Sequence, residues 1–458
     1  MSTPENSGLS RRDLLKQAST VAAASALTGV PLPAVHAQGT QTIQIALVGC
    51  GGRGTGAAID ALRSRHGPTR LVAMADVFQD RLDSCHRQVS QARPQQVEVP
   101  QANRFLGFDG YRRAMDTLRQ GDVVILATPP AFRWVHFKHA IERRLNVFME
   151  KPVAVDGPSC RRMFELGQES ERLGLKVGVG LMCRHCTARR KLFDRIQGGQ
   201  IGDLVLMRAY RLAGPTAYAF VTPRPASSNM TELLYQIRNF HGFLWASGGA
   251  FSDFLIHNTD ECCWMKNAWP VSAKGSGGRH YRGNYIDQNF DSYSTEYTFA
   301  DGTKIYLEGR CIEGCHQEFA TYVHGTRGSA IVSISGHTPS RCRTFRGQNF
   351  VNADVTWRCM QNEPNPYQLE WDHLLYAIRH DQPYNEVRRG TEASLITAMG
   401  RLACHTGRVW TRDQTLNHTH ELGAGVDRLN MESASPLVLG EDGKYPVPQP
   451  GIVTQREF

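Results

Sequence analysis

The chain has 458 residues and a formal charge of +9, which is enough length for two domains with sizeable cores. Lysines and arginines are interspersed with acidic residues and no basic run dominates, so the composition argues against a nucleic-acid-binding protein. Twelve cysteines are present, and we expect most of them to be buried free thiols.

The N-terminus has the pattern of an export signal. Residues 10–16, SRRDLLK, form a twin-arginine motif, residues 18–30 are weakly apolar, and residues 34–37 suit cleavage. The apolar stretch is too short, and too rich in alanine, serine and threonine, to span a membrane. We therefore expect residues 1–37 to be a twin-arginine signal peptide, with a disordered basic tail as the alternative. The mature protein would then be periplasmic or otherwise exported.

Residues 42–180 alternate short apolar runs with amphipathic segments, which is typical of a doubly wound parallel sheet. The predicted strands are residues 43–48, 71–75, 123–127, 147–149 and 176–179. We expect an α/β Rossmann domain here. Its ligand crevice should lie at the carboxyl ends of the strands, where Thr128 and Pro129 follow the third run.

The first predicted strand leads into a glycine-rich turn that fits G-x-G-x-x-G. That motif alone is weak, but here a helical stretch follows it and Asp76 ends the next apolar run. The turn allows a pyrophosphate to approach the backbone and the helix N-terminus, and a ligand-free turn is the alternative. The carboxylate of Asp76 suits the ribose hydroxyls of NAD and would repel the 2′-phosphate of NADP. We expect NAD to contact Gly49, Gly51, Gly52, Arg53 and Gly54.

The character of the chain changes after about residue 200. Residues 204–212 and 293–299 have β-rich composition, and a hairpin turn leads into residues 304–312. We expect an antiparallel sheet within a second domain, residues 181–365. Residues 366–410 are predicted to form helices that pack back against the other parts, and residues 411–458 a tail.

A histidine and an aspartate in the second domain are candidates for acid–base chemistry. If residues 251–264 are helical, Asp253 and His257 are four residues apart and share one face. A satisfied core histidine is the alternative for this pair taken alone. No metal site is predicted, because spacing singles out no further ligands. Cys183-Arg184-His185-Cys186 has redox or zinc spacing, but no second pair with matching spacing follows.

Lys151 completes this candidate site. Removing a proton from a secondary alcohol suits a neutral imidazole, which a nearby carboxylate can orient. A lysine ammonium beside the same oxygen stabilises the developing alkoxide. Lys151 follows a predicted strand end between Glu150 and Pro152, and a solvated surface lysine is the alternative. We expect His257 to act as base, Lys151 as alkoxide stabiliser and Asp253 as orienter.

These motifs carry a family resemblance across residues 42–410. The turn at residues 49–54, Glu150-Lys151-Pro152, and Gly248-Gly249 followed by Asp253 and His257 resemble the Gfo/Idh/MocA oxidoreductases. The resemblance implies an open antiparallel sheet with helices on one face, used for substrate binding and for a dimer or tetramer. It also implies Lys151, Asp253 and His257 as catalytic residues. Ser247 and Leu255 depart from the pattern, so substrate does not transfer by analogy.

The resemblance implies further site residues. Thr128, Pro129, His136 and Glu150 would contribute to the cofactor site. Arg184 and Arg238 would line the substrate pocket together with His257, although structural salt bridges are an equally good interpretation of the two arginines.

The predicted export route bears on mechanism. Free NAD is not expected outside the cytoplasm, so an exported enzyme should hold its cofactor tightly and reset it in each cycle. In export and fold the chain is similar to glucose–fructose oxidoreductase. We expect hydride transfer at a secondary hydroxyl of a sugar or glycoside. The alternatives are an NAD-dependent glycoside hydrolase, as in related glycosidases, and a non-catalytic sugar-binding module.

Overall fold

The computed structural model describes residues 41–217, 219–280, 282–334, 336–360 and 362–458. The predicted signal peptide, residues 1–37, lies outside the described residues. Within the described part of the chain, no helix is both long enough and apolar enough to cross a membrane.

The N-terminal part is a six-stranded parallel sheet in the order β3-β2-β1-β4-β5-β6. Its inner strands β1, β4 and β5 are mostly buried and mostly apolar, as expected for a sheet covered on both faces. The strands are β1 (Ile43–Val48), β2 (Thr69–Asp76), β3 (Arg104–Leu106), β4 (Val123–Leu126), β5 (Asn146–Met149) and β6 (Val177–Val179). The predicted Rossmann arrangement is confirmed.

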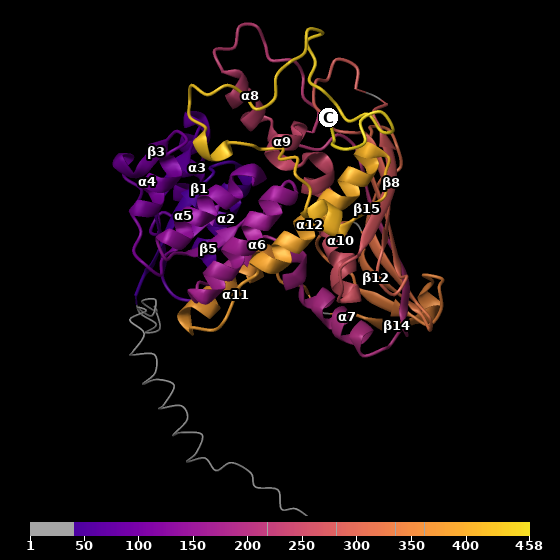
Figure 1. The fold of residues 1–458 in the computed structure, drawn as a ribbon. Helices are drawn as coiled ribbons and strands as arrows, with labels where there is room; N and C mark the ends of the chain where they lie inside the picture. The colour runs from indigo at the N-terminus through magenta and orange to yellow at the C-terminus, as the bar shows by residue number, and fades with distance from the viewer. Residues whose placement is uncertain (1–40, 218, 281, 335, 361) are drawn as a thin grey trace, which may run out of the picture.

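Helices cover both faces of this sheet. On one face lie α4 (Gly110–Asp116), α5 (Arg133–Glu142) and α6 (Gly157–Arg172). On the other lie α2 (Gly52–Arg63), α3 (Gln79–Ala92) and, from far along the chain, α11 (Pro366–Arg379). Trp371 of α11 stacks on Phe148 of β5 with ring centroids 4.5 Å apart. Helix α11, from the last quarter of the chain, therefore completes the layer of helices on this face of the Rossmann sheet (Figure 1).

The second part is a nine-stranded sheet in the order β14-β13-β12-β11-β7-β10-β9-β8-β15. All of its pairs are antiparallel except β10 with β7. The predicted mostly antiparallel sheet is thus confirmed. Its strands are β7 (Leu204–Ala213), β8 (Ser272–Gly278), β9 (Ser292–Thr298), β10 (Lys304–Cys311), β11 (Glu318–Gly325), β12 (Ser329–Ile334), β13 (Arg343–Phe345), β14 (Val355–Arg358) and β15 (Trp410–Thr411).

Two long buried helices join the sheets. Both α10 (Gly249–Lys266) and α12 (Val387–Thr406) pack on the nine-stranded sheet, and α12 also contacts α6 of the Rossmann part (Figure 1). Shorter elements are η3 (Met182–His185), α7 (Thr187–Gln197), α8 (Glu232–Arg238), α9 (Leu244–Ser247) and α13 (Arg412–Leu416). The predicted tail packs against the body, since Leu437, Tyr445 and Glu457 are buried.

Candidate active site

A cavity of about 1000 Å³ lies where the Rossmann part meets α10. The carboxyl ends of the parallel strands open into it, which is where open α/β sheets bind ligands. Its lining includes the turn after β1, Asp76 at the end of β2, Thr128 after β4 and Lys151 after β5. From the second part it is lined by residues of β7, α10 and neighbouring loops, among them Arg211, His241, Asp253, His257 and His337.

The glycine-rich turn has the shape that a dinucleotide requires. A Cβ at Gly54 would lie 1.9 Å from the carbonyl oxygen of Gly49, so only glycine allows the turn to close. A Cβ at Gly51 or Gly52 would meet nothing within 4 Å, so this backbone faces open space. Helix α2 begins there without a side-chain cap at Gly51. The turn therefore offers backbone N–H groups to a pyrophosphate, and these residues fit the predicted cofactor.

Asp76 lies beside this turn with its carboxylate held by the backbone. The N–H groups of Cys50 and Phe78 donate to Oδ2 and Oδ1 at 2.6 and 2.9 Å. Burial raises the pKa of Asp76, and these two hydrogen bonds act against that rise. The carboxylate also lines the cavity, as a contact to ribose hydroxyls requires.

The loop after β4 is fixed by a buried arginine that the sequence did not suggest. Arg133 donates to the carbonyl oxygens of Leu126 and Thr128 at 2.6 and 2.8 Å. Thr128 Oγ1 lies 3.1 Å from Nδ1 of His136. Burial lowers the pKa of His136 to about 3, with a further contribution from Arg133, so this imidazole is neutral at physiological pH. Thr128, Pro129 and His136 all line the cavity.

Arg53 and Glu150 form an ion pair at the wall of the cavity. Nε of Arg53 lies 2.5 Å from Oε1 of Glu150, and Nη2 lies 3.1 Å from Oε1 of Glu370 on α11. The guanidinium also lies 4.7 Å from the ring centre of Tyr367. The two residues thus join the dinucleotide turn to β5 and α11, in addition to lining the cavity.

Lys151 and Asp253 bring the two parts of the molecule together. Nζ of Lys151 donates to the backbone carbonyl oxygen of Asp253 at 2.7 Å and lies 3.5 Å from its Oδ1. Oδ2 of Asp253 lies 3.1 Å from Nε2 of His241. Burial opposes ionisation of Asp253, but Lys151 and His241 outweigh it and hold the pKa of this carboxyl well below its usual range. His241 is a site residue that sequence patterns did not indicate.

His257 lies one helical turn beyond Asp253 and lines the same cavity as Lys151. Its buried Nδ1 has no hydrogen-bond partner among the residues that the structure describes. Asp253 therefore does not fix the tautomer of His257 through Nδ1, contrary to the expected orienting role. Burial lowers the pKa of His257 far below its usual value, and the nearby His337 and Lys151 lower it further. The imidazole is neutral, as a general base must be.

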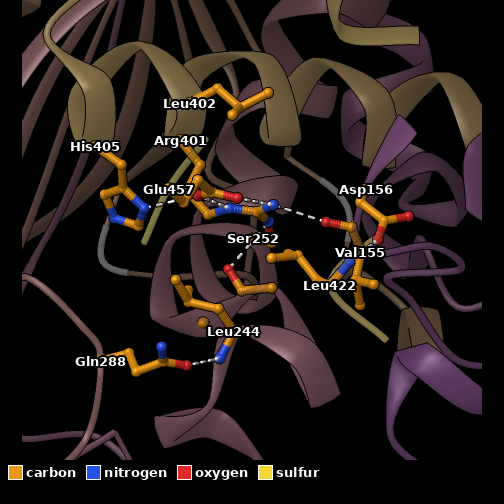
Figure 2. Close-up of polar contacts among 12 residues, drawn as sticks. Val155, Asp156, Leu244, Ser252, Gln288, Arg401, Leu402, His405, Leu422 and Glu457 are labelled. Atoms are coloured by element: carbon orange, nitrogen blue, oxygen red, sulfur yellow. Dashed lines mark hydrogen bonds and ion pairs between the residues drawn. The ribbon is translucent and has the colours of Figure 1, made fainter. Parts of the chain in front are cut away.

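Arg401, which forms a buried ion pair with Glu457, links Val155 to Ser252 near the start of α10 (Figure 2). Arg401 of α12 donates to the carbonyl oxygens of Val155 and Gly248 and to Oγ of Ser252. Nε of Arg401 lies 2.8 Å from Oε1 of Glu457, near the end of the chain. Nδ1 of His405 is 2.7 Å from the same carboxylate oxygen. The C-terminal segment thereby stabilises the geometry of the site.

The structure places the two predicted substrate arginines differently. Nε and Nη2 of Arg184 donate to Oδ2 and Oδ1 of Asp260, each at 2.8 Å, and Arg184 is not among the cavity-lining residues in the described part of the chain. This geometry matches the structural salt bridge that was the alternative interpretation. Arg238 lines the cavity, pairs with Asp80, and lies 4.6 Å from the ring centre of Phe78.

These features define the class of the protein, an NAD(P)-dependent oxidoreductase with a Rossmann domain. Residues 43–180 match the Gfo/Idh/MocA group, described as an oxidoreductase family with an NAD-binding Rossmann fold. Over 261 residues, 57% of this chain and 68% of the relative, the chain is 23% identical to scyllo-inositol 2-dehydrogenase (NAD(+)) of Bacillus subtilis. Residues 43–180 therefore belong to the Gfo/Idh/MocA oxidoreductases.

Two further comparisons cover most of the chain. Over 391 residues, 80% of this chain and 74% of the relative, it is 24% identical to a glycosyl hydrolase family 109 protein of Streptomyces coelicolor. The solved structure of aldose-aldose oxidoreductase from Caulobacter crescentus has the same fold, with a TM-score of 0.61 and 15% identity. That alignment covers 81% of this chain and 100% of the other.

Proposed function

We propose that this protein transfers hydride between a secondary hydroxyl of a sugar, cyclitol or glycoside and a tightly bound NAD. The observation that carries the proposal is that Lys151 and His257, from two parts of the fold, line one cavity with the dinucleotide turn. Inositol and aldose oxidoreductases among its relatives support the substrate class, because both oxidise or reduce polyhydroxylated rings or chains.

The side chains divide the chemistry between them. When bound, the nicotinamide supplies the hydride acceptor or donor. The neutral imidazole of His257 accepts the hydroxyl proton, and the ammonium of Lys151 stabilises the negative charge that develops on the oxygen. Asp253 holds Lys151 through its carbonyl oxygen and carboxylate. Its role in this proposal is therefore to position the ammonium, together with His241.

In this proposal the protein is exported in a folded state. It holds its cofactor tightly because free NAD is not expected outside the cytoplasm. The twin-arginine motif at residues 10–16 supports export. A retained cofactor has to be reoxidised on the enzyme by a second substrate or by the product itself. The choice of NAD over NADP is supported by the Asp76 carboxylate beside the turn.

Denaturing the purified protein and identifying the released nucleotide tests cofactor identity and retention. We expect NAD or NADH in near-equimolar amount. Adding inositols, aldoses and glycosides to the native protein should then change the absorbance of the bound nicotinamide. The proposal would be rejected if the protein neither carries nor takes up a nicotinamide nucleotide.

A second candidate is redox-assisted glycoside hydrolysis by the same residues. It is favoured by the relative from glycosyl hydrolase family 109, which aligns with 80% of this chain. In this reaction a ring hydroxyl is oxidised, the aglycone is eliminated, water is added and the ring is reduced again. Chromogenic glycosides distinguish the two functions: release of the aglycone without net change in NAD indicates the hydrolase, and sugar-dependent reduction of NAD without release indicates the dehydrogenase.

A further inference from the structure

Three potential metal ligands meet at the wall of the cavity. The ligand atoms of Cys183, His257 and His337 all lie within 4.8 Å of one another. They come from η3, from α10 and from the loop after β12, so sequence spacing could not have shown the cluster. Both histidines line the cavity, whereas Cys183 is not among its lining residues in the described part of the chain and is 1% exposed.

The spacing of the cluster is close to that of a tetrahedral zinc site. With zinc–sulfur and zinc–nitrogen bonds of about 2.3 and about 2.0 Å, a tetrahedral ion separates sulfur from nitrogen by about 3.5 Å. Sγ of Cys183 lies 3.5 Å from Nδ1 of His337. The rings of His257 and His337 are 4.4 Å apart between centroids, in an edge-on arrangement. The two other ligand-atom separations, from His257 to Cys183 and to His337, are each within 4.8 Å, so an ion would draw His257 toward the other two ligands.

A buried arginine fixes two of these elements, helix α10 and the loop with His337, relative to each other. The buried guanidinium of Arg189 on α7 lies 2.6 Å from Oε1 of Glu261 on α10. Arg189 also donates to the backbone carbonyl oxygen of His337 at 2.6 Å. This contact anchors the loop that carries His337 to the helix that carries His257. Metal sites depend on such outer contacts, because they hold the ligands in place before the ion arrives.

One buried polar atom of the cluster is left unsatisfied by the described residues. Nδ1 of His257, on a side chain that is 6% exposed, has no hydrogen-bond partner in the described residues. A buried polar atom without a partner costs free energy, and an ion would satisfy it.

We propose that Cys183, His257 and His337 bind one transition-metal ion, preferentially zinc, with its fourth position open to the cavity. Three protein ligands and one open position are the arrangement of zinc sites that take up small ligands. As the sulfur–metal bond forms, the Cys183 thiol loses its proton to solvent, so binding releases one proton. The resulting thiolate cancels one of the two positive charges that the ion brings next to Lys151, Arg189 and Arg211.

The site goes beyond the proposed hydride transfer and does not depend on it. A metal-bound imidazole already carries a proton on its other nitrogen, so it cannot accept the hydroxyl proton. Metal binding and the base role of His257 therefore exclude each other. We expect added zinc to lower sugar turnover in proportion to occupancy, and a chelator to restore it.

Metal binding is tested on the purified protein without any sugar. The chelator-treated protein is equilibrated with zinc, desalted and analysed for metal, with about one zinc ion per chain expected. Cobalt is then added in place of zinc, and the thiolate-to-cobalt charge-transfer absorption is recorded. Because neither readout needs turnover, failure of the metal site and failure of the proposed function are separately visible.

Two ligand variants and one matched control assign the site. Cys183→Ser should abolish the charge-transfer absorption, and His337→Asn should abolish metal retention after desalting. Cys186→Ser, which removes the neighbouring thiol of the same motif, should keep both. Circular dichroism and the unfolding transition report whether each variant is folded, and His337→Asn decides the outcome if Cys183→Ser does not fold. Wild-type protein that retains no metal, or a cobalt absorption unchanged by Cys183→Ser and His337→Asn, would overturn the proposal.

Discussion

Lys151 donates from Nζ to the backbone carbonyl oxygen of Asp253 at 2.7 Å, and this bond joins the end of β5 to helix α10. The ammonium is thereby held where the cofactor-binding part of the fold meets the second part. The nearby carboxylate of the same residue stays ionised because Lys151 and His241 outweigh the cost of its burial. A charged lysine is thus placed in the cavity without blocking it.

The low pKa of His257 predicts an unusual pH profile. Burial, with His337 and Lys151, keeps this imidazole neutral below the ordinary histidine value of about 6.5. The base therefore stays in its active form as pH falls through that range. We expect kcat/KM for the sugar to remain level from mildly alkaline pH to below about 6.5. A loss of activity centred on about 6.5 would show that His257 has an ordinary pKa or that another histidine is the base.

Replacing Asp76 should change the cofactor preference. In Asp76→Ser the negative charge near the ribose is removed, while the hydroxyl can still accept one of the two backbone hydrogen bonds now made to Asp76. We expect the affinity ratio to shift toward NADP by about tenfold, which corresponds to about 1.4 kcal/mol. Titration of the nucleotide-free protein with both cofactors measures it. The exposed Asp116→Ser is the control, and an equal response of both variants would remove Asp76 from the cofactor site.

The C-terminal ion pair should contribute strongly to stability. Glu457→Gln leaves the buried guanidinium of Arg401 without its charged partner, a change that typically costs about 3–5 kcal/mol. Chemical denaturation at neutral pH measures the loss. The exposed Glu441→Gln should change the free energy of unfolding by less than about 0.5 kcal/mol. Similar stability of the two variants would mean that the Arg401–Glu457 ion pair contributes little to the stability of the fold.

The same pair predicts a pH dependence of stability. Burial opposes ionisation of Glu457, but Arg401 and His405 outweigh it and lower the pKa of this carboxyl. In the unfolded chain a glutamate titrates near about 4.3, so the unfolded state binds a proton there first. The contribution of Glu457 is complete above that pH and declines as pH falls toward the folded pKa. The stability gap between wild type and Glu457→Gln should therefore narrow only in acid, and a gap that widens in acid would contradict the assignment.

The sequence predicted those parts of the fold and site that depend on local patterns. The strand, turn, helix and acid of the cofactor site lie close together in the chain, and the apolar runs of β1 and β4 are unambiguous. The helix with Asp253 and His257 was only assumed from the sequence, and α10 confirms it. Strand pairing was harder to predict, because the composition of a strand does not determine its neighbours in the sheet. The parallel pairing of β10 with β7 was not expected.

Long-range partners could not be predicted, since nothing local marks them. His241 and His337 each stand outside the motifs, and only the folded chain brings them to Asp253 and His257. The apolar face of α11 indicated a packed helix but not its position on the Rossmann sheet. An arginine such as Arg184 can bind an anionic ligand, so the sequence left its role open. In the structure it pairs with Asp260, which is distant in sequence. Glu457 lies in a polar, proline-rich stretch that gave no sign of a buried charge.

The central claim is that Lys151 and His257 act on one carbon–oxygen bond beside the bound nicotinamide. Its most direct test is the rate at which a substrate sugar reduces the enzyme-bound NAD in a single turnover, compared among wild type, Lys151→Met and the exposed control Lys138→Met. We predict that Lys151→Met keeps its nucleotide but is slowed by roughly 10²-fold or more, while the control matches wild type. Reduction of the bound NAD by Lys151→Met at the wild-type rate would contradict the claim.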